Sequence, residues 1–276
     1  MDAHSKGMVT AVRRGTVSMK HNEMDYFSFG FGNTPMVILP GLSLKSVMQS
    51  AEGVASAYRL FAQEYTVYCF DRTKFLSENI TVEQLAEDTA EAMESLGIRS
   101  ACVFGASQGG MMALYLAVNH PELVGRLVLG STCARLNPTA ESVMARWVAA
   151  ARRGDIDAFC DVFLDVLYGK AFAEQFGAFI RLAHRDVTEA DFRRFILLGD
   201  SCRGLNVYER LGEIRCPVLV LGAEDDRVLT AQASVEIAEK LGCPIYLYGG
   251  EYGHCVFDEA PDYKQRMYHF FKESHQ

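Results

Sequence analysis

The feature that most restricts the fold of this chain is a serine held between glycines, where an apolar strand passes into an apolar helix. Residues 101–104 form an apolar run that predicts a buried strand, and residues 111–117 form one that predicts a buried helix. Between them, the chain reads Gly-Ala-Ser-Gln-Gly-Gly, with the serine at position 107. Glycines two residues before and after Ser107 remove Cβ atoms that would clash where strand and helix converge. The pattern predicts a nucleophile elbow; the alternative is a serine that only caps a glycine-rich loop.

The composition of the chain limits the kinds of molecule that it is expected to bind. The chain has 276 residues, of which 49% are hydrophobic and 22% charged, and a net charge of -8. Nucleic acids and anionic membranes attract basic surfaces, so we expect neither as a partner. No apolar run approaches the ~20 residues of a transmembrane helix, and the N-terminus lacks the apolar core of a secretion signal. These features predict a cytoplasmic protein with a small-molecule substrate.

The eight cysteines do not form a recognisable framework. They include no C-x-x-C pair, and no cluster of cysteine, histidine and aspartate has the spacing of a zinc site. A chain of this length has no need of disulfides for stability. We therefore expect small buried thiols and no metal site.

Strand-like runs alternate with helical patterns along most of the chain, which predicts a mostly parallel sheet with helices on both faces. The predicted buried strands are 36–39, 66–70, 101–104, 127–129, 218–221 and 245–248. Nearer the N-terminus, residues 26–29 could add a strand. Residues 8–12 and 16–19 could form a hairpin that turns at Arg13-Arg14-Gly15.

Residues 134–207 interrupt this alternation, because they contain helical patterns and no strand-like run. They predict an all-helical cap inserted after the sixth strand, over the carboxyl edge of the sheet where sites in such folds form. Residues 1–133 and 208–276 would then make up the core. Most aromatic side chains of the block are expected in the core of the cap, although they could instead line an acyl pocket. They are Trp147, Phe159, Phe163, Phe172, Phe176 and Phe179.

A serine hydroxyl needs a base, and the base needs a carboxylate to orient it. His254 follows a glycine in the loop after the last predicted strand, and it is the strongest of seven candidate histidines. The loop after strand 218–221 offers adjacent acids, among which we favour Asp226 over Asp225. The chain order serine, acid, histidine is that expected of an α/β-hydrolase. Two backbone N–H groups should hold the oxyanion, and we assign them to Leu42, after Gly41, and to Gln108, after the serine.

Taken together, these motifs resemble the α/β-hydrolase superfamily, in its serine-hydrolase, esterase-like branch with a helical cap. The resemblance rests on Pro40-Gly41-Leu42, Asp71-Arg72-Thr73, the elbow, Asp226-Arg227-Val228, and Gly253-His254 followed by Glu259-Ala260-Pro261. It implies an eight-stranded-type, mostly parallel sheet. The register of the acid loop favours Asp226 over Asp225. A serine nucleophile argues against the dehalogenase and epoxide-hydrolase branches, which use aspartate there.

The function expected from these residues is hydrolysis of a carboxylic ester or lactone through an acyl-enzyme, with Ser107, His254 and Asp226 as a triad and no metal or organic cofactor. The same serine chemistry also serves thioesterases, C–C bond hydrolases and acyltransferases. A ligand receptor with slow turnover on the same scaffold is a further alternative. The cap, which would select the substrate, has no recognisable motif.

Overall fold

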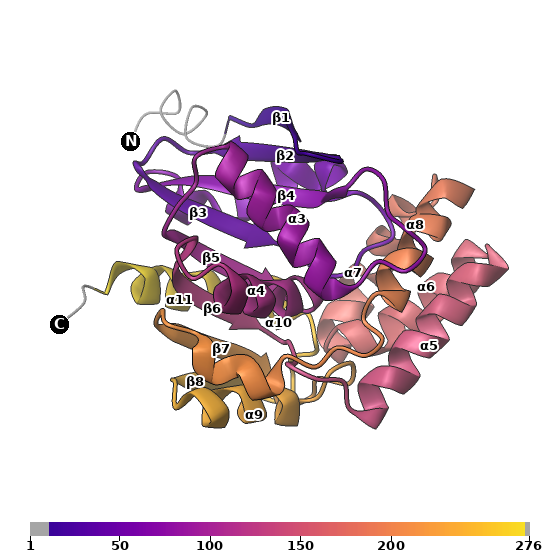
Figure 1. Ribbon diagram of the computed structural model, residues 1–276. Coiled ribbons are helices and arrows are strands. Elements are labelled where there is room, and N and C mark those ends of the chain that lie inside the picture. The colour runs from indigo at the N-terminus through magenta and orange to yellow at the C-terminus, as the bar shows by residue number, and fades with distance from the viewer. Residues whose placement is uncertain (1–10, 274–276) are drawn as a thin grey trace, which may run out of the picture.

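A computed structural model describes residues 11–273, which fold around one eight-stranded sheet. Its strands are β1 (Arg13–Ser18), β2 (Glu23–Phe29), β3 (Thr34–Leu39), β4 (Tyr65–Thr73), β5 (Ala101–Ala106), β6 (Val124–Gly130), β7 (Val218–Ala223) and β8 (Ile245–Tyr248). They lie in the order β1-β2-β4-β3-β5-β6-β7-β8, with β1 and β2 antiparallel and β4 to β8 joined by parallel pairings (Figure 1). The predicted mostly parallel sheet is confirmed.

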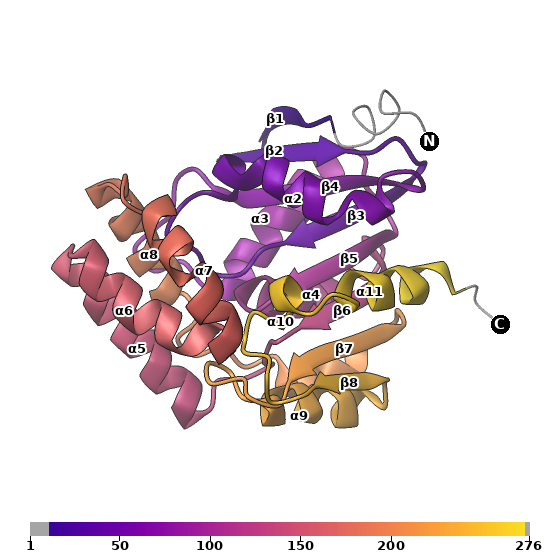
Figure 2. The same ribbon diagram turned by 180° about the vertical axis from the view of Figure 1, so that it is seen from behind.

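Helices cover both faces of the sheet, as expected for parallel strands that are apolar on both sides. One face carries α3 (Val82–Ser95), α4 (Gln108–Asn119) and α9 (Ala231–Leu241). The other carries α2 (Ala51–Ala57), α10 (Val256–Glu259) and α11 (Tyr263–Lys272), seen in front in Figure 2. Short 3-10 turns η1 (Val47–Ser50), η2 (Arg59–Phe61) and η3 (Tyr208–Glu213) complete the chain. The buried central strands thus lie between two apolar clusters.

Four further helices form a cap at the edge of the sheet where the parallel strands end. They are α5 (Pro138–Arg153), α6 (Ile156–Leu167), α7 (Lys170–Ala183) and α8 (Glu189–Asp200), on the right in Figure 1 and on the left in Figure 2. They follow β6 and precede β7 in the chain, and the all-helical cap is confirmed as part of the fold. The exact boundaries of a cap domain at 134 and 207 stay a prediction.

Local sequence explains where the cap helices begin and end. The Asn137 side chain accepts a hydrogen bond from the Ala140 amide with Pro138 in the first turn, and Gly154 ends α5 in a left-handed conformation. Asp155 caps α6 in turn. At α8, Thr188 and Asp191 form a reciprocal capping box. Each cap satisfies amide groups that have no partner within their helix.

The expected N-terminal hairpin is wrong in its register. The strand β1 runs through Arg13, Arg14 and Gly15, and the turn to β2 comes later, at residues 19–22. Gly15 pairs with Tyr26, whose ring fills the place that a Cβ at Gly15 would need. Gly15 is therefore needed to make room for the Tyr26 ring, and it does not mark a turn. Residues 8–10 of the expected hairpin lie outside the described residues.

All eight cysteines are free thiols, and six of them are buried, as small core side chains would be.

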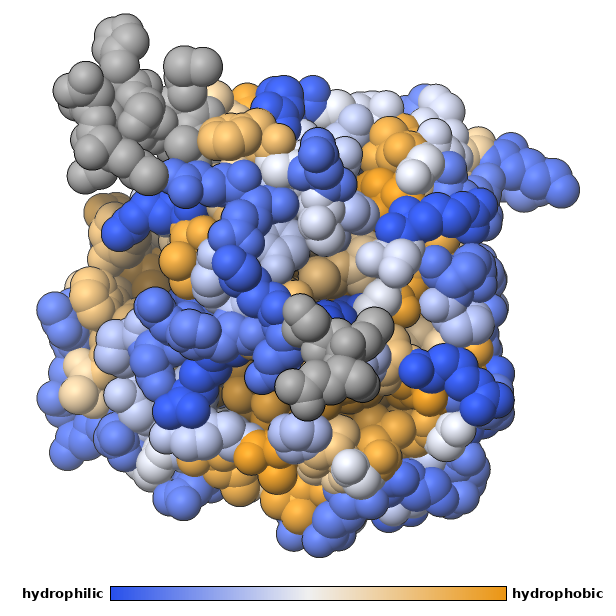
Figure 3. All heavy atoms as spheres, turned by 90° about the vertical axis from the view of Figure 1, so that its left-hand side faces the viewer, coloured by the Kyte–Doolittle hydropathy of each residue, from blue (hydrophilic) through white to orange (hydrophobic). Residues whose placement is uncertain are grey.

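On the face opposite the cap, apolar side chains gather near the start of β7 and the end of α9. Cys216, Pro217 and Leu241 line a hollow there (Figure 3). Between residues 11 and 273, no helix combines the length and apolar character needed to cross a bilayer.

The packing of α4 on β3 gives a testable prediction about stability. A Cβ added at Gly109 would lie 1.9 Å from the Leu39 carbonyl oxygen, a backbone atom that cannot move aside. We expect Gly109→Ala to lower the free energy of unfolding by about 3 kcal/mol, measured by urea denaturation. Gly53→Ala is the matched control, because its Cβ would meet nothing within 4 Å. It should stabilise α2 by about 0.5–1 kcal/mol. Equal effects of the two substitutions would contradict this packing argument.

Candidate active site

Ser107 stands at the strained turn between β5 and α4. Its backbone has φ 51° and ψ -119°, a conformation that residues with a side chain rarely adopt. The turn is held from below, since the Ser107 amide donates to the Gly130 carbonyl at 2.9 Å and the Thr132 hydroxyl donates to the Ser107 carbonyl at 2.7 Å. A Cβ at Gly105 would lie 2.5 Å from the Gly109 carbonyl oxygen. The strain is therefore offset by hydrogen bonds and by the tight approach that glycine permits.

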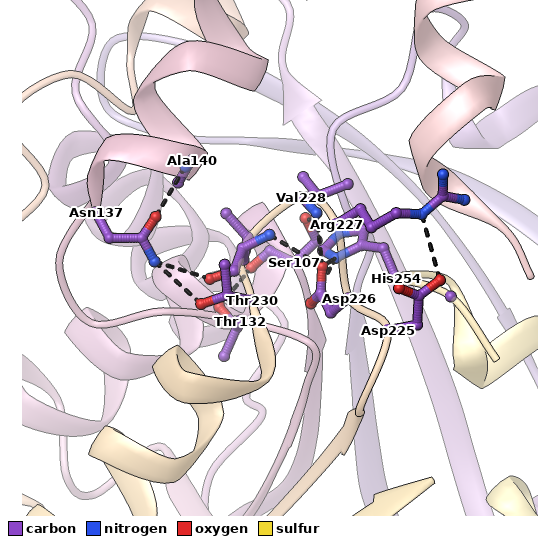
Figure 4. Close-up of polar contacts among 12 residues, drawn as sticks. Ser107, Thr132, Asn137, Ala140, Asp225, Asp226, Arg227, Val228, Thr230 and His254 are labelled. Atoms are coloured by element: carbon purple, nitrogen blue, oxygen red, sulfur yellow. Dashed lines mark hydrogen bonds and ion pairs between the residues drawn. The ribbon is translucent and has the colours of Figure 1, made fainter. Parts of the chain in front are cut away.

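Two loops at the carboxyl edge of the sheet bring a histidine and a carboxylate to this serine. His254 follows β8, and its Nε2 lies 2.9 Å from the Ser107 Oγ. Asp226 follows β7, and its carboxylate oxygens lie 2.9 and 3.0 Å from the His254 Nδ1 (Figure 4). All three residues are buried. The structure thus joins serine, histidine and aspartate into one continuous hydrogen-bonded chain.

The two adjacent acids of the β7 loop have different surroundings. The Asp226 carboxylate faces His254, while Asp225 is exposed and pairs with Arg227 at 3.4 Å (Figure 4). Asp226 also accepts hydrogen bonds from the Val228 and Leu229 amides, at 2.9 and 3.0 Å. The hydrogen bond to His254 comes from Asp226, the acid that the sequence favoured, whereas Asp225 forms its ion pair with Arg227.

Opposing effects set the charge state of Asp226. Burial by itself would raise the pKa of this carboxyl group. The charge and hydrogen bond of His254, with the Val228 and Leu229 amides, outweigh burial and hold the pKa of Asp226 below its usual value. Asp226 is therefore ionised at neutral pH, as a carboxylate must be to stabilise an imidazolium.

The loop after β3 passes close to the serine. A Cβ at Gly41 would lie 3.2 Å from the Ser107 Cβ, so only a residue without a side chain lets the loop come this near without displacement. Leu42 follows and lines the cavity at the serine. Gln108 is the first residue of α4, so its amide has no acceptor within the helix. No acceptor for the Leu42 or the Gln108 amide occurs among residues 11–273.

The Gln108 side chain has a role that sequence reasoning missed. It is fully buried, and its Nε2 donates to the Leu198 carbonyl in α8 at 2.6 Å. Its Oε1 accepts a hydrogen bond from Arg72 at 3.1 Å, and the same Arg72 nitrogen donates to the Pro40 carbonyl at 2.7 Å. Burial, followed by the nearby charge of Arg194, lowers the pKa of Arg72 to about 10. Arg72 thus links the elbow to the loop after β3, and the Gln108 side chain extends this link to the cap.

A cavity of about 470 Å³ opens over the serine, between the core and the cap. Ser107 and His254 lie on its wall. Of the aromatic cap residues, Trp147 and Phe163 line it, whereas Phe159 is buried in the cap core. Phe179 is 70% exposed. The aromatic residues of the cap are thus divided between the cap core, the cavity wall and the surface, and an acyl-binding role stays a prediction. Within the described part of the chain, no three potential metal ligands gather at one point.

The pKa of Asp226 predicts how stability depends on pH. Because the folded-state pKa lies below the unfolded value of ~3.9, the ionised carboxylate stabilises the fold fully above about pH 4. This contribution is lost as the pH falls through the folded pKa. We expect the loss of stability in Asp226→Asn to be large at pH 5 and to shrink towards pH 3, measured by urea denaturation. A difference that does not change over this range would contradict the assigned pKa.

The buried Gln108 link gives a second prediction. Gln108→Met keeps the volume but leaves the Arg72 and Leu198 groups without this partner, so we expect a loss of about 1–3 kcal/mol in the free energy of unfolding. Gln232→Met on the exposed face of α9 is the control and should change it by less than about 0.5 kcal/mol. If both variants unfold at the same urea concentration, the link does not stabilise the fold.

Comparison with curated proteins finds relatives of low identity. A Rhizobium rhizogenes protein named "Putative carbamate hydrolase RutD" is 28% identical over 166 residues, which are 58% of this chain and 62% of that protein. This chain therefore matches less than two thirds of the length of this relative and of two others of the same name. The protein named 3-oxoadipate enol-lactonase 2 from Acinetobacter baylyi is 21% identical, over 79% of this chain and 81% of its own.

Solved structures share the fold. The α/β hydrolase MGS-M2 from a deep-sea metagenome library superposes with a TM-score of 0.85 at 19% identity, covering 95% of this chain and 98% of its own. The enol-lactonase from Burkholderia xenovorans LB400 has a TM-score of 0.81 at 21% identity and covers 94% of this chain and 100% of its own. The sequence model described as the alpha/beta hydrolase family matches residues 36–263. The chain is therefore a member of the alpha/beta hydrolase family.

Proposed function

We propose that this protein is a serine hydrolase that cleaves carboxylic esters or lactones. The observation that carries the proposal is the hydrogen-bonded chain from Ser107 through His254 to Asp226 on the wall of a cavity. A serine bonded to a histidine that a buried carboxylate orients is the arrangement that acyl transfer requires. Family membership and relatives named for lactone hydrolysis support the same reaction class.

In the first half of the reaction, the His254 Nε2 takes the proton of the Ser107 hydroxyl as its oxygen attacks the substrate carbonyl. Asp226 keeps the other ring nitrogen protonated and stabilises the imidazolium. The Leu42 and Gln108 amides donate to the oxyanion of the tetrahedral intermediate. The C–O bond to the alcohol then breaks, and the alcohol leaves with the proton from His254.

In the second half, His254 removes a proton from water, and the resulting hydroxide attacks the acyl-serine. Collapse of the second tetrahedral intermediate releases the carboxylic acid and returns the proton to Ser107. The cavity is apolar on the cap side, around Trp147 and Phe163, which suits a small or medium apolar group of the substrate.

The neighbouring chemistries stay within the same proposal as alternatives. Thioesters, C–C bonds next to a carbonyl and transfer to an alcohol all proceed through the same serine adduct. The name of the RutD relatives adds carbamates to the substrates to be tested. A panel of p-nitrophenyl acetate and butyrate, a lactone, a thioester and a carbamate separates these, and absence of turnover on every member would favour a ligand receptor.

The roles of the three side chains are tested by substitution. We expect Ser107→Ala to lower kcat on p-nitrophenyl butyrate by at least about 10³-fold and to abolish labelling by a fluorophosphonate. Asp226→Asn should lower kcat by about 10²–10⁴-fold, because it favours the wrong tautomer of His254. Asp225→Asn is the matched control and should stay within about threefold of the parent. Unchanged turnover in Ser107→Ala would refute the nucleophile.

A further inference from the structure

The cavity over Ser107 has two unlike sides. Trp147, Phe163 and Ile180 of the cap belong to one apolar cluster and form an apolar wall. The opposite side comes from η1 and α10, where Val47 and Phe257 each pack against a second apolar cluster. There, the polar side chains of Gln49, Ser50 and Asp258 line the cavity beside these two apolar ones. A substrate in this cavity would meet hydrocarbon on the cap side and a mixed, partly polar surface on the other.

The polar side makes few contacts with the rest of the protein. Gln49, Ser50 and Asp258 are exposed to solvent. Among residues 11–273, their side chains have no hydrogen-bond partner in the protein, and Asp258 has no ion pair within 4 Å. Asp258 lines the cavity and stays exposed to solvent, so a ligand in the cavity can reach its carboxylate. Nearby protein atoms raise the pKa of this carboxyl group, and the charge of Lys264 partly opposes that effect.

The other charged groups around the cavity are already matched. Lys45 lines it too, but its ammonium group binds the Asp186 carboxylate and the Ala183 carbonyl. His184 directs its Nδ1 to the Ile180 carbonyl at 2.7 Å. Lys264, whose charge acts on Asp258, binds the Phe257 carbonyl and lies over the Tyr58 ring. Among the described residues that line the cavity, Asp258 is thus the charged side chain without a hydrogen bond or ion pair in the protein.

We propose that Asp258, with Gln49 and Ser50 of the same cavity wall, forms a subsite that selects substrates carrying a cationic ammonium group. The apolar cap wall takes the hydrocarbon part, and the carboxylate pairs with the cation, since opposite charges at a cavity wall attract more strongly than in bulk water. This inference rests on the proposed function, because it concerns the same cavity. It assigns a specificity-determining role to Asp258 and no part in bond cleavage.

The test compares esters that differ only in charge. Choline butyrate and 3,3-dimethylbutyl butyrate place the difference in the alcohol, and p-nitrophenyl esters of 4-(trimethylammonio)butanoate and 5,5-dimethylhexanoate place it in the acyl part. The readout is the ratio of kcat/KM for the cationic over the neutral ester, which cancels changes in the amount of folded enzyme. We expect Asp258→Asn to lower this ratio by about tenfold in at least one pair.

Glu174→Gln is the control, since it removes an equal charge from an exposed position on α7, outside this cavity. It should leave the ratio unchanged; an equal fall in both variants would assign the preference to overall charge and overturn the subsite. A ratio that is the same in the parent and in Asp258→Asn for both pairs would also overturn it.

Binding separates the subsite from the reaction. Calorimetric titration of Ser107→Ala with the same esters measures affinity without turnover. Tighter binding of the cationic ester, lost in Ser107→Ala/Asp258→Asn, supports the subsite even if the parent hydrolyses none of the esters, in which case only the proposed function fails. Equal affinity for the cationic and neutral esters in Ser107→Ala refutes the subsite even if turnover is fast.

Discussion

The close approach of α4 to the end of β3 is the constraint on which the rest of the structure depends. With Cβ positions at Gly105 and Gly109 that would overlap backbone atoms, helix and strand pack almost backbone to backbone. This packing leaves a turn so tight that Ser107 takes a positive φ, with its hydroxyl in contact with His254. It also brings the Leu39–Pro40 backbone against the first turn of α4. The serine, the loop after β3 and the free amides of that turn are therefore consequences of one contact.

The buried carboxylate of Asp226 is tolerated because hydrogen bonds compensate for its loss of contact with water. Asp226 lies among apolar residues at the end of β7, where an unpaired carboxylate would be costly. Two amides from its own loop and the His254 ring supply the compensation. The same contacts fix the ring orientation of His254, so the stability of the loop and the geometry at Ser107 come from one set of hydrogen bonds.

Much of this arrangement is predictable from the sequence, for identifiable reasons. Glycine spacing around Ser107 reports a local steric requirement, and parallel strands bring the loops after β7 and β8 to the same edge, so Asp226 and His254 were expected near the serine. Their roles in catalysis stay predictions. The hairpin register was wrong because Gly15 can mark a turn or a place under an aromatic ring, and only the pairing with Tyr26 decides.

The hydrogen bonds between cap and core could not be predicted from the sequence, because they join segments far apart in the chain and no local sequence pattern marks them. Glu259 accepts hydrogen bonds from Gly253, before the histidine, and from Gly169, at the start of α7. The Cys255 amide donates to the Leu167 carbonyl at the end of α6. The residues directly before and after His254 are thus both connected by hydrogen bonds to the junction between α6 and α7. Cap position and histidine position are consequently coupled, and a change in the cap that altered the cavity would also act on the hydrogen bond between His254 and Ser107.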